Sequence, residues 1–421
     1  MPSPLVTSVL VALALTLEPS ASAHRDALAS ITFDEALALS AHTEAARTRA
    51  ETLENRRRAD QRIPRVTRNP EVTVQPGGRL RPEDERGLAW QAQVSQSWNL
   101  RDAGRARRDA MRAETQALSA DLRRRALVQR LDAARAWVDL RATERVAALT
   151  REERLLAERL LEHTQAAFEA RVLTRADLAE ARRFVAEVEV RQAELEGRAH
   201  ELGLQLAAAA GLDPGAPVAT RGPTPQPMLP DDAVLARRLS SARELPQVVA
   251  ARLEGTAARA RAVEARAQRG MLLTVGAAAM QDGPRELVLQ GVIGLTIPAF
   301  DRGQAESSRA RTAAGLAEAD AEQADRALRS ELARLVHDLH HTKEMHRRLE
   351  SELVPTLADL VEAREALRAV GEVAVFEVVT ARRQLLDART SLARIEGELS
   401  WAELVVWLYL AELEQALSET R

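Results

Sequence analysis

The chain has 421 residues, a formal net charge of −3, 29% charged and 3% aromatic residues, and no cysteine. The lack of cysteine excludes disulfides, thiolate chemistry and lipidation of an N-terminal cysteine, and the near-neutral charge gives no basic field for nucleic acid. A composition dominated by Ala, Leu, Arg and Glu is typical of long helices and coiled coils.

The N-terminus has the features of a signal peptide over residues 1–23. The apolar run from Leu5 to Leu17 is too short to span a bilayer, and Ala21-Ser22-Ala23 forms a cleavage site before His24. No later segment reaches 18 consecutive apolar residues, so no helix is expected to cross a membrane. We therefore expect the mature chain to be exported.

The mature chain is predicted to form two matching units. After a helix at 32–62, the first unit (24–230) has strands at about 70–75 and 88–100, a helical hairpin at 102–211 and a Pro-rich linker at 212–230. The second unit (231–421) has a helix at 231–270, strands at about 271–281 and 286–298, and a hairpin at 301–417.

The strand at 88–100 has the clearest pattern. Trp90, Val94 and Trp98 share an apolar face that only Gln96 interrupts, while Gln, Ser and Asn dominate the other face. Trp90 and Trp98 lie ~26 Å apart at about 3.3 Å per residue, which matches the ~25 Å apolar band of an outer-membrane barrel. A strand of a water-soluble sandwich also alternates, but seldom over this length with Trp near both ends.

The strand at 286–298 carries a similar apolar face, which includes Leu289, Ile293 and Leu295. Four strands cannot close a membrane barrel, whose smallest form has eight, and open sheet edges are not tolerated in lipid. We therefore expect three copies to complete a twelve-stranded barrel together, with these apolar side chains and those of the strand at 88–100 facing lipid.

Very long helices follow each strand pair. Between Asp102 and Ala170 there is no proline, and 65–70 helical residues would extend about 100 Å. The return path is broken by the linker at 212–230, so two collinear halves match one outward rod. Pro355 lies inside the second outward helix and predicts a kink there.

The two units also share short sequence anchors about 200 residues apart. Ala181-Arg182-Arg183 returns as Ala381-Arg382-Arg383, and Leu195-Glu196-Gly197 returns as Ile395-Glu396-Gly397. Leu127 and Leu131 are echoed by Leu328 and Leu332. This spacing indicates duplication of a whole unit.

Together these features resemble the TolC-type outer-membrane efflux channel family over essentially all of the mature chain. The matching stretches are Ile31-Thr32-Phe33-Asp34-Glu35-Ala36-Leu37, Gly294-Leu295-Thr296-Ile297-Pro298-Ala299-Phe300-Asp301-Arg302-Gly303, and Gly371-Glu372-Val373-Ala374-Val375-Phe376-Glu377-Val378 with its continuation Ala381-Arg382-Arg383-Gln384-Leu385-Leu386. The resemblance implies a mainly α fold with membrane β: a long coiled-coil α-helical barrel, plus four β-strands per protomer in a trimeric twelve-stranded outer-membrane β-barrel.

The same resemblance implies the function and the partners. The chain would be the exit duct of a tripartite efflux or secretion system, a homotrimer that conducts substrates passively and couples to a periplasmic adaptor and an inner-membrane pump. Outer-membrane lipid would surround it, and it would extend into the periplasm. The alternatives are a periplasmic coiled-coil adaptor, which should carry a lipoyl-like β domain, and a coiled-coil structural protein.

The two hairpin tips are the candidate gate and adaptor contact. They comprise Arg171, Val172, Leu173, Thr174 and Asp177 in the first unit, and Gly371, Val373, Val375 and Glu377 in the second. Arg171 stands where the resemblance leads one to expect glycine. Asp177 and Glu377 either favour the helix dipole or place six carboxylates near the tunnel mouth of a trimer.

No catalytic constellation is evident, so no enzyme activity and no cofactor are expected. Four of the eight histidines gather at 337–346, and His337 and His341 have the i, i+4 spacing of a metal-chelating pair. The alternative is polar surface on a rod, which we favour, since tight binding in a conduit would slow release.

Overall fold

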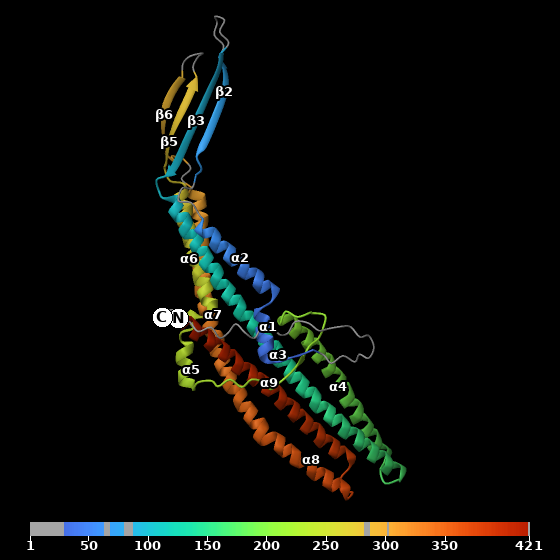
Figure 1. The fold of residues 1–421 in the computed structure, drawn as a ribbon. Helices are drawn as coiled ribbons and strands as arrows, with labels where there is room; N and C mark the ends of the chain where they lie inside the picture. The colour runs from blue at the N-terminus through green and yellow to red at the C-terminus, as the bar shows by residue number, and fades with distance from the viewer. Residues whose placement is uncertain (1–28, 63–67, 80–86, 282–286, 301–302, 420–421) are drawn as a thin grey trace, which may run out of the picture.

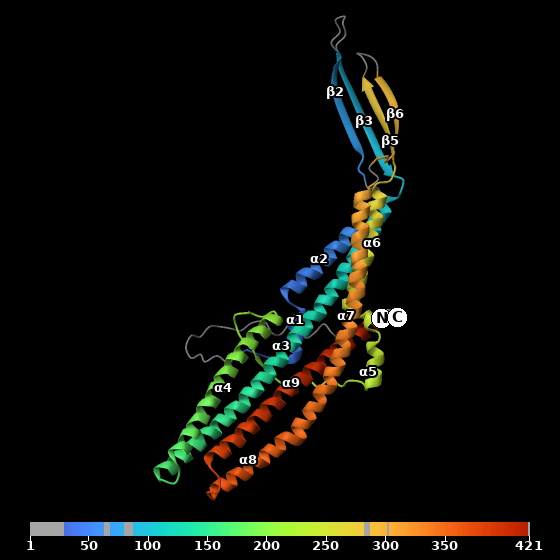
Figure 2. The same ribbon diagram turned by 180° about the vertical axis from the view of Figure 1, so that it is seen from behind.

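The computed structural model describes residues 29–62, 68–79, 87–281, 287–300 and 303–419 (Figure 1). The molecule is elongated, with a β-sheet at one end, helical rods running away from it, and two helical hairpin tips at the far end (Figures 1 and 2).

The first half of the chain contains β1 (Ser30–Ile31), α1 (Phe33–Ala41), α2 (Glu44–Gln61), β2 (Glu71–Arg79), β3 (Gly87–Asn99), α3 (Ala103–Glu169), α4 (Arg175–Ala209) and β4 (Ala219–Thr220). The second half contains α5 (Asp232–Leu239), α6 (Pro246–Gln268), β5 (Leu272–Gln281), β6 (Leu287–Thr296), α7 (Gln304–Arg348), α8 (Val354–Ala369) and α9 (Val375–Glu419). None of the described helices is both long and apolar enough to cross a membrane.

Four strands form one antiparallel sheet in the order β2, β3, β5, β6. The pairing of β3 with β5 joins the strand pairs of the two units, with Ser95 opposite Gly276. Because β2 and β6 each have one neighbour, the sheet of a single chain is open at both edges.

The helix α3 is the longest element, and its 67 residues extend about 100 Å. Near the sheet, α3 lies in an upper helical layer with the order α2, α3, α6, α7. Toward the tips, α3 lies in a lower helical layer with the order α4, α3, α9, α8. The lower part of α7 also packs against α9. The same long helix therefore runs through both layers.

Two helices predicted as continuous are broken, so those predictions are wrong. The helix expected at 32–62 is two helices, because Thr43 leaves the helix and its hydroxyl accepts from the Ala46 N–H, which caps α2. The helix expected at 231–270 is divided into α5 and α6, because Pro246 starts a new helix and has no N–H to continue the previous one.

The second outward rod is interrupted just before Pro355. A π-helical turn, Leu349–Leu353, separates α7 from α8, which begins with Val354 and Pro355. Proline removes one backbone hydrogen bond and its ring crowds the preceding turn, so the turn widens there. The rod also changes direction between the upper part of α7 and α8 (Figure 2).

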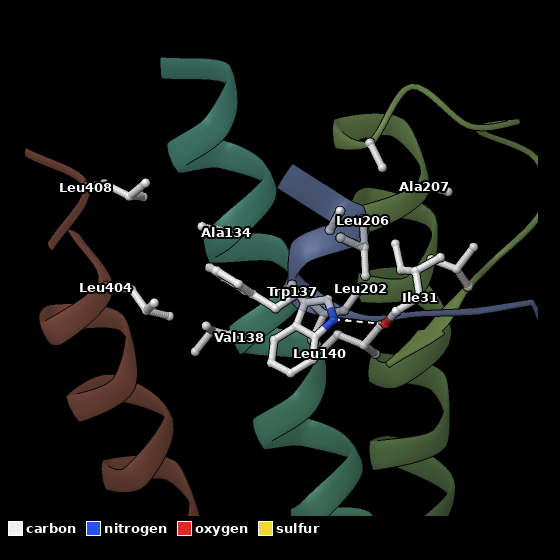
Figure 3. Close-up of a cluster of buried hydrophobic side chains, with 14 residues drawn as sticks. Ile31, Ala134, Trp137, Val138, Leu140, Leu202, Leu206, Ala207, Leu404 and Leu408 are labelled. Carbon is white, nitrogen blue, oxygen red and sulfur yellow. Dashed lines mark hydrogen bonds between the residues drawn. The ribbon is translucent and has the colours of Figure 1, made fainter. Parts of the chain in front are cut away.

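A belt at mid-height ties the start of the chain to the linker. In it, β1 pairs in parallel with β4, Ser30 opposite Ala219. Trp137 of α3 is fully buried beneath this pair, and its indole Nε1 donates to the Ile31 carbonyl at 3.0 Å (Figure 3). Phe33 meets the Trp137 ring edge-on at 5.7 Å between centroids. This apolar cluster is the core that holds the belt against the rods.

Candidate functional site

The outward face of the sheet is an apolar surface. Six side chains predicted to face lipid all lie exposed on this face, from Ile293 at 81% exposed to Trp90 at 38%: Trp90, Val94, Trp98, Leu289, Ile293 and Leu295. A Cβ built on Gly291, on this face, would meet no atom within 4 Å, whereas one on Gly276, on the other face, would collide with Val94 and Ser95. The apolar face is therefore open at Gly291, whereas β3 packs closely on Gly276 on the other face.

Gln96, the polar residue that interrupts the apolar face on β3, has a structural explanation. The Gln96 amide donates to the Arg68 carbonyl at 2.9 Å and to the Ser97 carbonyl at 3.1 Å. Its donors are therefore satisfied by backbone at the place where the chain enters β2. A hydrogen-bonded amide costs far less in an apolar setting than a free one, so Gln96 does not break the pattern.

The inward face of the sheet is polar on β3, mixed on β5 and β6, where Val288 and Val292 share it with Gln290, and almost uncharged. Gln91, Gln93 and Ser95 lie on it, and the Ser97 and Thr274 hydroxyls hydrogen bond at 2.8 Å. Among the strand residues whose side chains are described, Glu71 is the one charged side chain on this face. On β3 this face is therefore suited to water rather than to lipid.

The two hairpin tips use the same left-handed turn. Arg171 has φ 62° and Gly371 has φ 81°, and their N–H groups donate to the carbonyls of Phe168 and Arg368, each at 2.9 Å. Arg171 therefore adopts the conformation that favours glycine, at a cost of about 1–2 kcal/mol. The arginine in the first tip does not change the shape of the turn.

The matched acids at the tips have different partners. Asp177 forms a capping box: its carboxylate accepts from the Thr174 N–H at 3.0 Å and from the Thr174 hydroxyl at 2.6 Å. Glu377 instead forms an ion pair with Arg364 of α8. The Thr174 hydroxyl holds the pKa of Asp177 below its usual range, helped by the backbone N–H groups of Thr174 and of Val375 in the other tip. Asp177 is thus the N3 partner in the capping box of α4, and it also touches the second hairpin.

The apolar residues predicted at the tips as adaptor contacts, Val172, Leu173, Val373 and Val375, are not all exposed. Val375 is fully buried between the two hairpins, with Ala157, Phe184 and Val379, so its assignment to the exposed tip patch is wrong. Leu173 packs at the edge of the same cluster and Val373 is half-buried. The exposed apolar side chains are Val172 as predicted, together with Val370 and Phe376. Phe376 adjoins Val375, and only packing decides which of the two neighbours is covered.

Ion pairs between the two hairpins were missed by sequence reasoning. Arg382 of α9 contacts Glu153 of α3 at 3.5 Å and also pairs with Glu365 of α8. Arg368 of α8 donates to the Thr164 hydroxyl of α3 at 3.3 Å. Burial raises the pKa of Glu153, and Arg382 opposes that rise. No local signal distinguishes these residues from the many arginines and acids on solvated helix faces.

The histidine cluster is divided among separate contacts. The His337 and His341 rings stack with centroids 6.3 Å apart, but His340 Nε2 lies 2.9 Å from an Asp232 oxygen in α5, and His346 lies between Glu350 and Glu396. In the described part of the chain, no group of three or more His, Cys, Asp or Glu residues is arranged to hold a metal ion.

We predict that replacing His337, His340, His341 and His346 together by Gln leaves export unchanged. Glutamine keeps the helix polar and removes imidazole ligation. The measurement is growth of a complemented deletion strain across metals and drugs. A selective loss of Zn²⁺ or Ni²⁺ tolerance would instead identify a metal-linked duct.

The His340–Asp232 contact predicts a small pH dependence. The Asp232 carboxylate, and then the Val336 carbonyl, raise the pKa of His340 above 6.5. The stabilisation is therefore fully present below pH 6.5 and lost as the pH rises through the folded-state pKa. Because the pair is exposed, we expect His340→Gln to cost well under 1 kcal/mol at about pH 5.5 and nothing well above pH 7. The melting temperatures of the wild-type protein and of His340→Gln, measured from about pH 5.5 to above pH 7, test this expectation. A difference between them that does not change with pH would contradict it.

An open sheet with an apolar outer face, continued by rods with paired hairpin tips, defines the fold of the TolC-type outer-membrane channels. No protein-family model and no curated protein matches the sequence. Among solved structures, the outer-membrane channel OprN is similar at TM-score 0.76 and 17% identity, covering 90% of this chain and 89% of that one. A membrane protein from Pseudomonas aeruginosa is similar at TM-score 0.71 and 17% identity, covering 91% of both chains.

A third similar structure is the outer membrane protein VceC from Vibrio cholerae, at TM-score 0.67 and 14% identity, covering 90% of this chain and 95% of that one. The likeness in fold therefore covers 89–95% of the length of these three chains. All three are described as membrane proteins, and the first as an outer-membrane channel.

Proposed function

We propose that this chain is the outer-membrane exit duct of a tripartite efflux or secretion system. In this proposal three copies close a twelve-stranded barrel in the outer membrane, and their rods form a tunnel that extends into the periplasm. Substrates pass through it from a periplasmic adaptor and an inner-membrane pump. The adaptor and the pump are inferred from the likeness to channel structures.

The observation that carries the proposal is the open four-stranded sheet with exposed apolar side chains on one face. An open edge and an apolar face are both unfavourable in water, and an open edge is not tolerated in lipid. Closing a ring of copies removes the edges and leaves the apolar face toward lipid. Neither a periplasmic adaptor nor a structural coiled coil requires such a sheet.

Localisation and export test the proposal together. We expect the protein in the outer-membrane fraction, as a trimer after detergent extraction. We also expect a deletion strain to accumulate exported substrates inside the cell, and the reintroduced gene to return their concentration to the wild-type level. Protein that stays in the soluble periplasmic fraction without detergent would contradict the proposal.

The tips are proposed to close the tunnel at rest and to contact the adaptor through Val172, Val370 and Phe376. Asp177 and Glu377 would then lie near the constriction. We predict that Asp177→Asn with Glu377→Gln lowers cation preference in a planar bilayer, because six carboxylates are neutralised in a trimer.

The conservative substitutions matter here. Asp177 is the N3 residue of the capping box of α4, so Asp177→Ala would also remove its hydrogen bonds with Thr174 and weaken the start of the helix, whereas Asn keeps a side-chain oxygen that can accept from the Thr174 N–H. A matched control is Glu194→Gln on α4, far from the tip. If the double variant keeps the wild-type conductance and selectivity, Asp177 serves only in the capping box and Glu377 only in its ion pair.

A further inference from the structure

The apolar face of the sheet continues to the last residues before the rods. Leu100, Met271 and Ile297 each lie one residue beyond an end of β3, β5 or β6, and all three are exposed. The Leu100 N–H donates to the Met271 carbonyl at 2.9 Å, so the pairing of β3 with β5 extends to this row. Phe300, three residues after Ile297, is 95% exposed. The apolar surface therefore reaches the junction where the sheet meets the rods (Figure 1).

Arginines gather at the same junction. Arg68 lies just before β2, Arg101 follows β3 and Arg269 precedes β5, and all three are exposed. We call these three residues the arginine collar. The chain as a whole has a net charge of −3, yet residues 99–108 hold four arginines and one acid, Asp102. Positive charge is therefore concentrated at the end of the rods nearest the sheet.

Glycines make room for two of the collar side chains. A Cβ on Gly270 would lie 2.9 Å from the Arg101 Cγ and 2.6 Å from the Asn99 Oδ1, so the stem of Arg101 lies over the Gly270 backbone. The φ of Gly270 is not positive, so this close packing is what requires glycine there. A Cβ on Gly303 would likewise lie 2.5 Å from the Arg269 Cγ. The stems of both arginines are thus packed against neighbouring turns.

The collar lies next to the lipid-facing side of the sheet. The Gln96 side chain, on the apolar face, donates to the Arg68 carbonyl at 2.9 Å. Arg101 lies three residues beyond Trp98. Tryptophan is enriched at the level of lipid headgroups, and arginine keeps its stem on apolar surface while its charged end extends into polar surroundings. The collar is therefore placed at the headgroup level of the membrane.

The acids closest to the collar in sequence have partners within the chain. The Asp102 carboxylate accepts from the Arg105 N–H at 3.2 Å and caps α3, and a Glu306 oxygen lies 3.7 Å from Arg269. Arg68 and Arg101 form no ion pair with any residue that the structure describes. Their guanidinium groups are therefore available to an anion from outside the chain.

We propose that the arginine collar binds the phosphate groups of anionic phospholipids in the periplasm-facing leaflet of the outer membrane. Guanidinium donates two parallel hydrogen bonds to phosphate oxygens, and the adjoining apolar row of Leu100, Met271 and Ile297 would contact the acyl chains. These contacts would fix the height of the sheet in the membrane. The inference rests on the proposed function and adds a lipid class and the residues that recognise it.

Lipid binding to the full-length trimer in detergent tests the proposal. Native mass spectrometry counts bound phosphatidylglycerol, and zwitterionic phosphatidylcholine is the comparison. We expect the wild-type protein to prefer phosphatidylglycerol, and we expect Arg68→Gln with Arg101→Gln to weaken its binding by about tenfold. Replacing the same two arginines by Lys should retain most of the binding. The matched control is Arg47→Gln with Arg159→Gln, which removes two exposed arginines from the rods and should bind as the wild-type protein does.

Three results would overturn this inference alone if the protein still forms trimers in the outer membrane and supports export. One is equal binding of the two lipids by the wild-type protein, and another is equal loss of binding in the two Gln variants. The third is unchanged lipid binding in the collar variant with an altered ion selectivity in a planar bilayer, because the arginines would then line the tunnel. Protein that stays soluble without detergent would overturn the proposed function as well.

Discussion

Replacing Ile293 by Arg should prevent efficient insertion of the sheet into the outer membrane. Ile293 is 81% exposed on the apolar face, opposite Val275 of β5. An arginine on the lipid side of a barrel costs roughly 2–4 kcal/mol near the bilayer midplane. The measurements are the amount of trimer in the outer membrane and equilibrium unfolding of the protein reconstituted in lipid vesicles.

The matched control for this substitution is Gln290→Arg. Gln290 lies three residues away on the same strand, on the inward face opposite Ala278, and is exposed, so its arginine would remain in water. Ser95 is a poorer control because it is buried against Gly276. Equal losses from Ile293→Arg and Gln290→Arg would mean that the apolar face does not contact lipid.

Replacing Trp137 by Ala should release the belt from the rods. Trp137 is fully buried in the cluster with Phe33, Leu206 and Leu404, and large-to-small changes of a buried tryptophan cost about 3–5 kcal/mol. The lost volume lies where α1, α4 and α9 meet α3, so belt and rods should loosen together. Thermal unfolding, and protease cleavage near Arg221 in the linker, would report this loss.

Trp137→Phe separates packing from hydrogen bonding. The Ile31 carbonyl also accepts from the Arg221 N–H at 2.9 Å, so loss of the indole donor leaves it with one partner. We therefore expect the Phe variant to lose only a part of what the Ala variant loses. If Trp137→Ala melts at the same temperature as the wild-type protein, the cluster does not hold the belt.

Much of this fold follows from local pattern. Period-two alternation predicted β3 and its apolar face, since a strand places successive side chains on opposite sides whatever surrounds it. The proline-free stretch after Asp102 predicted the rod α3, because uninterrupted helix-forming sequence needs no tertiary partner to define its length. The anchors 200 residues apart likewise required no structure.

Thr43 and Pro246 end or begin helices through local cap and proline chemistry, within stretches that otherwise favour one continuous helix. Other features depended on contacts between distant segments. Val375 and Phe376 are adjacent apolar residues at the same tip, yet one is buried and the other exposed, because the two hairpins approach from one side.

The sequence by itself determined the repeated order of strands and rods and the apolar face of the sheet, because these depend on spacing along one segment. Only the tertiary structure decided which arginines pair across helices and which face of α4 is left uncovered. Arg182 and Arg382 occupy matched positions in matched sequences. They differ because α9 lies between α3 and α8, whereas α4 lies at the edge of the layer.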